Sequence, residues 1–207
     1  ISALRTSQIA ALTTASISVL SGAQIAAITS TQAAKLSSDQ TAALSGDQII
    51  SLDLDALAAL DTTAFSALSS DAIGALSSNQ IVALTTKQAA ALTSTQAGVL
   101  SSTQIAALET ADLAAFTTAS IAAFADSQVT ALSGDQIRAL RATQINALST
   151  AAIAALTTTQ IEALSATQIS TLGLDGVKAL TQPQIAALTS QQAVALTTAQ
   201  IAALSSD

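Results

Sequence analysis

Large apolar side chains recur along the chain at a fixed step of eight residues. Of the 26 positions in register with Leu4, 23 are Leu and the others are Ile28, Phe116 and Phe124. Three residues before these positions stands a second bulky apolar residue, which is Ile in 16 of 26 cases. The register holds over the whole length without an insertion or deletion. The hydrophobic pattern is therefore that of an internal repeat of eight residues, an octad.

Polar residues occupy equally regular places between the apolar ones. Ser or Thr follows the Leu position in 19 of 26 octads, and Gln precedes the Ile position in 17 of 25. The consensus is Leu-(Ser/Thr)-x-x-Gln-Ile-Ala-Ala. Its Ser/Thr-x-x-Gln segment is a capping box, in which the hydroxyl and the Gln side chain satisfy the free amides of a helix start. Ser37 with Gln40 and Thr157 with Gln160 are examples.

Substitutions in the cap column favour the same interpretation. Asp53 and Asp61, which are good N-caps, replace Ser or Thr. Pro183 falls in a first helical turn, where proline is tolerated. Each octad is then a helix of roughly six residues with Ile and Leu on one face. Helices this short must stack, so the sequence predicts an all-α solenoid of very short capped helices, one per octad, that forms a regular screw.

Two other folds compete with this one. In a single long helix, residues eight apart lie about 80° out of phase, so the Leu column would wind around the axis without forming a seam. A β-solenoid is the main alternative, but Ala and Gln are poor strand formers. The apolar Ile-Ala-Ala-Leu block is also contiguous rather than alternating.

The repeat also defines the domain organisation. Residues 1–207 form one uninterrupted octad array, and we expect it to be a fragment of a longer repeat protein. Three groups of octads depart from the consensus, namely Asp53–Leu68, Glu109–Ser127 and Gly173–Leu180. Neutral drift or local bends are the simpler explanation of these departures, and a binding site is the other.

Composition excludes several classes of partner and site. The chain has no Cys, His or Met, only 9% charged residues and a formal charge of −7. Disulfides, Cys/His zinc sites and His- or Cys-based catalysis are excluded. The acidic balance argues against nucleic acid and anionic lipid as partners. We expect no membrane span, because the longest fully apolar run is the six residues Ala151–Leu156.

Candidate catalytic and metal-binding residues are few. Lys35, Lys87 and Lys178 show no Ser-x-x-Lys spacing, so an enzyme is not expected. Five acidic residues within 25 positions could suggest calcium: Asp47, Asp53, Asp55, Asp61 and Asp71. Calcium requires six to eight converging oxygens, whereas helix capping and the first-turn position explain each Asp singly. We therefore predict no catalytic, cofactor-binding or metal-binding residues, and no cofactor.

Two resemblances arise from the polar motif. Leu84-Thr-Thr-Lys-Gln88 and Leu156-Thr-Thr-Thr-Gln160 resemble the Leu-Thr-x-x-Gln motif of periplasmic chaperones of the spheroplast-protein-Y type, which use it sparingly between long charged helices. Leu196-Thr-Thr-Ala-Gln-Ile-Ala-Ala-Leu204 is similar to the octad arrays of very large bacterial repeat proteins, and this likeness covers the whole chain. The second resemblance implies a secreted or surface-exposed structural or adhesive role and identifies no functional residues.

Two functional hypotheses follow. The first is a structural repeat protein of the bacterial cell exterior, which forms a rod, filament, sheath or stalk by repeat stacking and self-association. A mean hydropathy of +0.57 favours lateral association of copies. The second is an adhesin or scaffold that presents its Thr/Ser/Gln surface to a glycan or protein partner.

Overall fold

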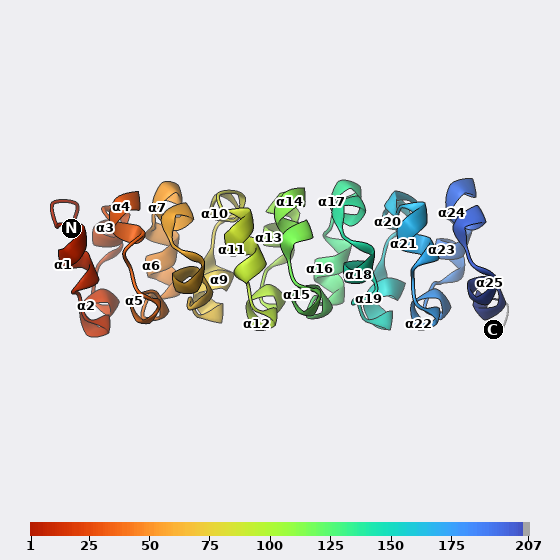
Figure 1. Cartoon of the computed structure of the whole chain (residues 1–207), viewed down its shortest axis with the longest axis horizontal. Coiled ribbons are helices and arrows are strands. Elements are labelled where there is room, and N and C mark those ends of the chain that lie inside the picture. The colour runs from red at the N-terminus through yellow and green to blue at the C-terminus, as the bar shows by residue number, and fades with distance from the viewer. Residues whose placement is uncertain (205–207) are drawn as a thin grey trace.

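A computed structural model describes residues 1–204 of the chain, which fold into an elongated superhelix of short helices (Figure 1). The described residues form 25 α-helices of four to seven residues and no strand. The two ends of the described chain lie at opposite ends of the superhelix. The predicted all-α solenoid with one helix per octad is confirmed, and the β-solenoid alternative is wrong.

The helices follow one another at the octad step. In chain order they are α1 (Thr6–Ala10), α2 (Thr14–Ser18), α3 (Gly22–Ala26), α4 (Ser30–Ala33), α5 (Ser38–Ala42), α6 (Gly46–Ser51), α7 (Leu54–Ala59), α8 (Thr62–Ser66), α9 (Ser70–Ala75), α10 (Ser78–Val82), α11 (Thr86–Ala91), α12 (Ser94–Gly98), α13 (Ser102–Ala107), α14 (Thr110–Ala115), α15 (Thr118–Ala122), α16 (Asp126–Thr130), α17 (Gly134–Ala139), α18 (Ala142–Ile145), α19 (Thr150–Ala155), α20 (Thr158–Ala163), α21 (Ala166–Ser170), α22 (Leu174–Lys178), α23 (Gln182–Ala186), α24 (Ser190–Ala195) and α25 (Thr198–Leu204).

The helices begin where the sequence predicts, directly after the Ser/Thr column. At α20 the Thr157 hydroxyl accepts a hydrogen bond from the Gln160 amide at 3.2 Å, and the Thr157 amide donates to Gln160 Oε1 at 2.9 Å. Pro183 stands in the first turn of α23, as expected. Leu164, which ends α20, has φ −60° and ψ 137°, so the bend to the next helix uses extended backbone. Among the described residues no φ is positive, and for this reason the bends require no glycine.

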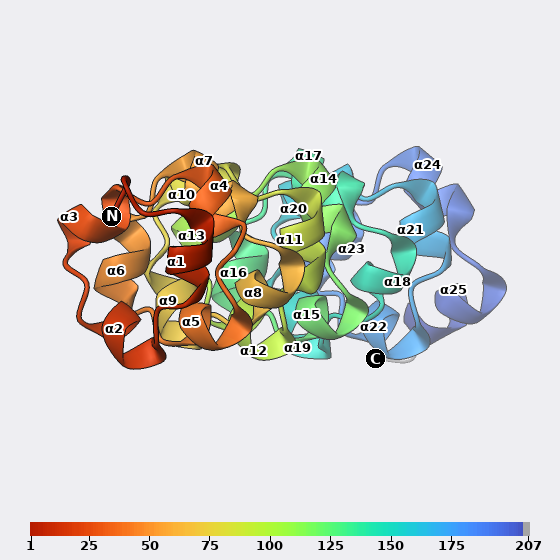
Figure 2. The same ribbon diagram turned by 60° about the vertical axis from the view of Figure 1, so that its left-hand side comes forward.

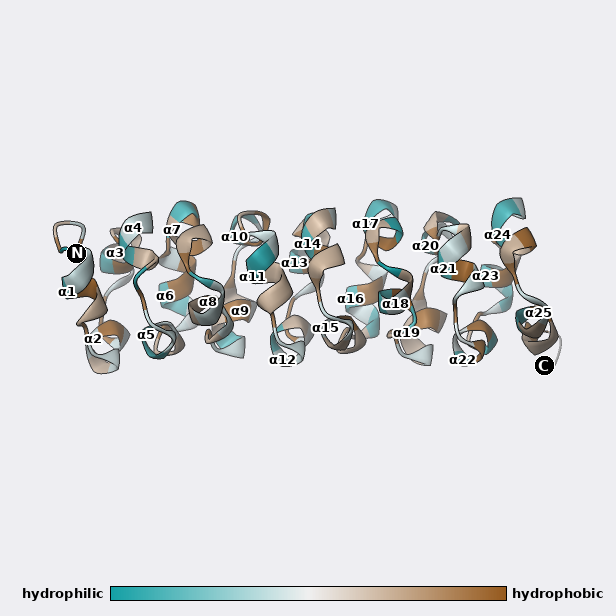
Figure 3. Ribbon diagram, viewed as in Figure 1, coloured by the Kyte–Doolittle hydropathy of each residue, from teal (hydrophilic) through white to brown (hydrophobic). Residues whose placement is uncertain are grey.

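The Ile and Leu columns form one continuous core along the superhelix. Ile81 and Ile161 are fully buried, and the neighbouring Leu84 and Leu164 are 5% and 4% exposed. Figure 3 shows both hydrophobic and hydrophilic segments on the short helices from one end of the superhelix to the other. No helix of the described part is both long enough and apolar enough to cross a membrane.

The turns of the superhelix are stacked so that each helix packs against the third helix after it, as α4 does against α7 and α17 against α20. Hydrogen bonds between turns join residues 23 to 31 apart in sequence. One superhelical turn therefore takes between three and four octads, so the helices of successive turns are offset around the axis. Figure 2 shows the stacked turns from a second direction.

Small residues lie where these turns meet. A Cβ added at Gly46 would lie 3.0 Å from the Ala75 Cβ, and one added at Gly134 would lie 3.3 Å from the Ala163 Cβ. This contact explains why Ala is common just before the Leu column, because a larger side chain there would push the turns apart.

Candidate functional site

The consensus Gln side chain forms hydrogen bonds both within its own octad and to an earlier turn of the superhelix. Gln136 of α17 accepts a hydrogen bond at Oε1 from the Ser133 amide at 2.8 Å, which closes the predicted capping box. Its Nε2 donates to the backbone carbonyls of Ile105 and Leu108, both at 2.8 Å. These carbonyls belong to the C-terminal end of α13 and the bend after it, four octads earlier. The side chain thus joins the start of one helix to the end of another.

The same arrangement recurs along the whole superhelix. Fifteen Gln side chains donate Nε2 to the carbonyl oxygen 28 residues earlier, at 2.6–3.0 Å, and we call this set the amide ladder. Its members are Gln32, Gln40, Gln48, Gln80, Gln88, Gln96, Gln104, Gln128, Gln136, Gln144, Gln160, Gln168, Gln184, Gln192 and Gln200. All of them are buried, whereas Gln8 and Gln24 are exposed. Gln8 and Gln24 lie fewer than 28 residues from Ile1, so this chain offers them no carbonyl at that separation.

The ladder solves a problem inherent in short helices. The last carbonyls of any helix lack partners within that helix, and here helices of four to seven residues make such carbonyls abundant. Burying an unbonded carbonyl costs about 1–3 kcal/mol. A Gln amide from the following turn satisfies two of these oxygens at once. The ladder therefore links each superhelical turn to the one before it through backbone acceptors.

Seven octads from residue 53 onward have a residue shorter than Gln at the ladder position. The Gln position holds Ala56, Ala64, Ala72, Asp112, Ser120, Ala152 and Gly176 in these octads. Only Ser120 among them keeps the axial bond, because its hydroxyl donates to the Leu92 carbonyl at 2.9 Å. In the first turn, Ser16 also stands at a Gln position.

The interruptions fall largely in the three groups of octads that depart from the consensus. Asp53–Leu68, Glu109–Ser127 and Gly173–Leu180 nevertheless form the helices α7, α8, α14, α15 and α22 in register with the rest. Departure from the consensus therefore removes ladder bonds locally and leaves the path of the chain intact.

Asp112 is the one buried carboxyl in the ladder row. The residue is 1% exposed, and Oδ2 is buried without a hydrogen-bond partner. Burial raises the pKa of this carboxyl above its ordinary value of 3.8, the hydrogen bond from the Thr86 side chain opposes the rise, and the negative charge of Glu109 adds to it. Glu109, at the N-cap of α14, makes no side-chain cap bond, so this octad also lacks a capping box.

The five clustered acidic residues have the local roles that capping predicts. Asp53 accepts from the Asp55 amide at 3.0 Å, and Asp61 accepts from the Ala64 amide at 2.8 Å. Asp47, Asp55 and Asp71 lie in the first turns of α6, α7 and α9. No three acidic side chains of the described residues lie close enough together to hold a metal ion.

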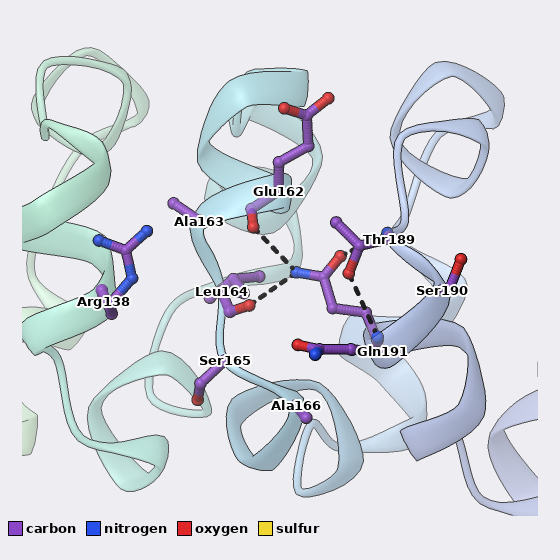
Figure 4. A pocket seen from close by; sticks show the side chains of 10 residues that line it. Arg138, Glu162, Ala163, Leu164, Ser165, Ala166, Thr189, Ser190 and Gln191 are labelled. Atoms are coloured by element: carbon purple, nitrogen blue, oxygen red, sulfur yellow. Dashed lines mark hydrogen bonds between the residues drawn. The ribbon is translucent and has the colours of Figure 1, made fainter.

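The surface between neighbouring turns carries shallow grooves. One groove of about 540 Å³ is lined by Glu162, Ser165, Thr189 and Gln192, with Arg138 at one side. Figure 4 shows Glu162 and Ala163 of α20 in the middle of the view, with Arg138 of α17 on one side and Thr189, Ser190 and Gln191 at the start of α24 on the other. The Gln192 amide crosses the groove and donates to the Leu164 carbonyl at 2.7 Å. Arg138 also pairs with the exposed Asp135 at 2.8 Å.

Two further grooves lie at equivalent places in the repeat. One, of about 580 Å³, is lined by Ala58, residues 60–62 and residues 85–87, including Lys87. The other, of about 570 Å³, lies between residues 172–176 and the segment from Ile145 to Ile153. The groove is thus a feature of the repeat geometry, found beside consensus octads as well as beside the irregular ones. Lys35 and Lys178 do not line any of these three grooves.

The octad matches a known repeat. The sequence model of a family described as the ALTTAQ repeat matches residues 1–38, 49–86, 105–142, 135–166 and 142–174. These segments cover more than half of the chain. The chain belongs to the ALTTAQ repeat family. No curated protein shows significant similarity to it.

Sequence reasoning on the ALTTAQ array found the cap role of Gln and missed its axial role. The signal was present but indirect: Glu also closes a capping box, yet it stands at none of the 25 positions of the Gln column. An amide differs from a carboxylate in that it can also donate a hydrogen bond. The acceptors are backbone carbonyls, which every residue type has. They therefore leave no signature in the sequence. The special character of Asp112 follows only from the burial of the ladder row.

Proposed function

We propose that the ALTTAQ array serves as a structural rod on the outside of the bacterial cell. The observation that supports this most directly is the amide ladder, because it joins successive turns by hydrogen bonds at fifteen octads between Gln32 and Gln200. In a solenoid each repeat contacts only its neighbours, and stability is approximately a sum over repeats and their interfaces. Adding octads therefore lengthens such a rod without requiring a new core.

The groups on the rod surface suit a passive structural role. The exposed cap column carries short neutral hydroxyls, and titratable groups are sparse, with 9% charged residues in the chain. The acidic side chains that are present act mainly at helix starts, where the helix dipole favours negative charge.

Lateral association of rods is the second part of the proposal. Several large apolar side chains lie on the surface, among them Val19 at 79% exposed, Val82 at 48% and Val194 at 86%. They stand on different turns, so the apolar area is distributed along the rod. Copies lying side by side would bury these side chains, which favours bundles at about 25 cal/mol per Å² of apolar area buried.

Sedimentation velocity over a wide concentration range, with negative-stain electron microscopy of the same samples, tests the association. We expect concentration-dependent growth into bundles of parallel rods. Val82→Lys combined with Val194→Lys should weaken bundling, whereas Thr118→Lys, which adds a charge at an exposed polar position, should weaken it less. A sharp monomer boundary at all concentrations would contradict the association and leave the single-rod role standing.

The cellular location needs its own experiment. Antibodies against the array should label intact cells of the producing organism, and external protease should remove that label before cytosolic markers are degraded. Recovery of the array only in the cytosolic fraction would contradict an exterior rod.

The recurring grooves favour an adhesin or scaffold as a second candidate. Their hydroxyl, amide and charged side chains, such as Ser165, Thr189 and Arg138, are of the kind that bind glycans or polar protein segments. A glycan array probed with the full chain tests this candidate, with Arg138→Ser and a swap of Asp53–Leu68 for consensus octads as comparisons. Weaker glycan binding by Arg138→Ser would support this candidate, because Arg138 lines the groove. The absence of any bound glycan would argue against glycan recognition.

A further inference from the structure

Asp112 is a carboxyl at a position where most octads have an amide that donates a hydrogen bond. At the equivalent place in fifteen octads an amide donates to the carbonyl 28 residues earlier. For Asp112 that carbonyl is Leu84, and among the hydrogen bonds of the described residues no donor reaches the Leu84 oxygen. A carboxylate can only accept hydrogen bonds. An ionised Asp112 would therefore place a buried negative charge in a row whose bonding partners are carbonyl oxygens.

The next octad shows what a short side chain can do here. The Ser120 hydroxyl, at the same place in its octad, donates to the Leu92 carbonyl at 2.9 Å. A side chain shorter than Gln thus reaches the ladder acceptor when it carries an O–H group. A protonated carboxyl carries such a group, and a proton is the one cation that requires no additional space in a buried site.

We propose that Asp112 is held as the neutral acid in the folded array and replaces the ladder amide by donating its proton to the Leu84 carbonyl. Octad 109–116 is then a pH-sensitive joint between two turns. Ionisation removes the donor and leaves a buried charge, so the joint loosens as pH rises. The raised pKa that burial causes is consistent with this direction.

The charged groups around the joint do not compensate the charge. On α14's own octad, Glu109 is exposed and negative, and it opposes ionisation. Two helices pack against α14. Lys87 is the charged residue of α11, and Asp135 and Arg138 are those of α17. Lys87 is exposed and Arg138 is engaged with Asp135 at 2.8 Å. Arg141, in the bend after α17, donates from Nη2 to the Phe116 carbonyl at 2.8 Å and is engaged there. Of these charged groups only Glu109 acts on the pKa of the Asp112 carboxyl, and its sign favours the neutral acid. The hydrogen bond from the Thr86 side chain lowers that pKa, but burial raises it by more.

The direction of the pH effect follows from linkage. Because the folded-state pKa lies above the ordinary value of 3.8, the folded array binds more protons than the unfolded chain between these two values. The contribution of Asp112 is fully present below the unfolded pKa and is lost as pH rises through the folded pKa. Paired carboxylates with lowered pKa values would give the opposite slope.

The direct test is an NMR titration of the full chain with ¹³C-labelled aspartate carboxyls. We expect the Asp112 resonance to titrate at higher pH than those of the exposed Asp residues, and Asp112→Asn identifies its signal. Titration of Asp112 together with the exposed carboxyls would overturn the proposal. The titration itself uses the wild-type chain, and if Asp112→Asn fails to fold, sequential backbone assignment identifies the Asp112 signal instead.

Stability measurements supply the second arm. The urea midpoint of the wild type should fall from about pH 4 to about pH 8 relative to that of Asp112→Gln, which restores the consensus amide. The matched control Asp39→Asn changes an exposed first-turn carboxyl and should leave the pH dependence as in the wild type. Equal pH dependence in the wild type and Asp112→Gln would overturn the proposal. A calcium site would also overturn the proposal. It would show as a rise of the urea midpoint at about pH 8 when CaCl₂ is added to the wild type, with no rise in Asp112→Gln.

Discussion

Replacing one ladder Gln by Ala isolates the axial hydrogen bonds. Gln136→Ala removes three bonds, one from the Ser133 amide and two to the Ile105 and Leu108 carbonyls, each 2.8 Å long. Mutational values of about 1 kcal/mol per bond give a loss of about 3 kcal/mol. The better helix propensity of Ala returns a few tenths of a kcal/mol. We therefore expect a net loss of about 2–3 kcal/mol.

Gln24→Ala is the matched control within the same chain. Gln24 accepts from the Ser21 amide at 2.9 Å and is exposed, without a ladder acceptor. We expect this change to cost about 1 kcal/mol. The difference between the two variants, about 1–2 kcal/mol, is the contribution of the axial bonds.

The assay must resolve individual octads, because repeat arrays need not unfold in one step. Native-state hydrogen exchange of the amides in octads 101–108 and 133–140 gives the local free energy of opening. In Gln136→Ala both octads should lose protection, although they are four octads apart. Loss confined to octad 133–140, or equal losses in the two variants, would show that the axial bonds contribute nothing and would refute the role of the ladder.

Three other substitutions test the remaining parts of the repeat. Leu156→Ala truncates a side chain that is 3% exposed and should cost about 2–5 kcal/mol in urea unfolding, and a loss below about 1 kcal/mol would place the Leu column outside the core. Thr157→Ala removes the acceptor of the Gln160 amide and should cost about 1 kcal/mol in the same assay, and Thr157→Ser should restore most of it. Asn146→Ala removes hydrogen bonds to the Thr171 carbonyl at 2.6 Å and from the Gly173 amide at 2.8 Å, and it should cost about 1–2 kcal/mol. Hydrogen exchange at the Gly173 amide should become faster, and unchanged exchange there would contradict this contact between turns.

The local structure of each octad could be predicted from the sequence because it depends on near neighbours. The Thr157–Gln160 pair lies three residues apart, so its capping box follows from the pattern alone. The buried Leu and Ile columns follow from their placement on one helix face. The same reasoning predicts Asp53 and Asp61 as caps, and their hydrogen bonds to the Asp55 and Ala64 amides confirm it.

The number of octads per turn could not be predicted, and the ladder shows why. The contact that sets it pairs a side chain with a backbone carbonyl 28 residues away, as Gln200 pairs with Leu172. Every octad presents the same carbonyl whatever its side chains, so no second residue type needs to vary with Gln. A side-chain contact between turns would have produced a longer period in the sequence, whereas a backbone acceptor leaves the eight-residue period unmodified.

This dependence on backbone acceptors also explains how the array tolerates its irregular octads. When Ala64 replaces Gln, one donor is lost, but the carbonyls that octad 61–68 itself offers to later turns are unchanged: Gln96 still donates to the Leu68 carbonyl at 2.7 Å. A defect in one octad is therefore not transmitted to the octads that bond to it. Only a residue that introduces a new requirement, as the buried carboxyl of Asp112 does, changes the conditions under which a turn is stable. The array can thus drift freely at its amide positions while a single acidic substitution gives one joint a response to pH.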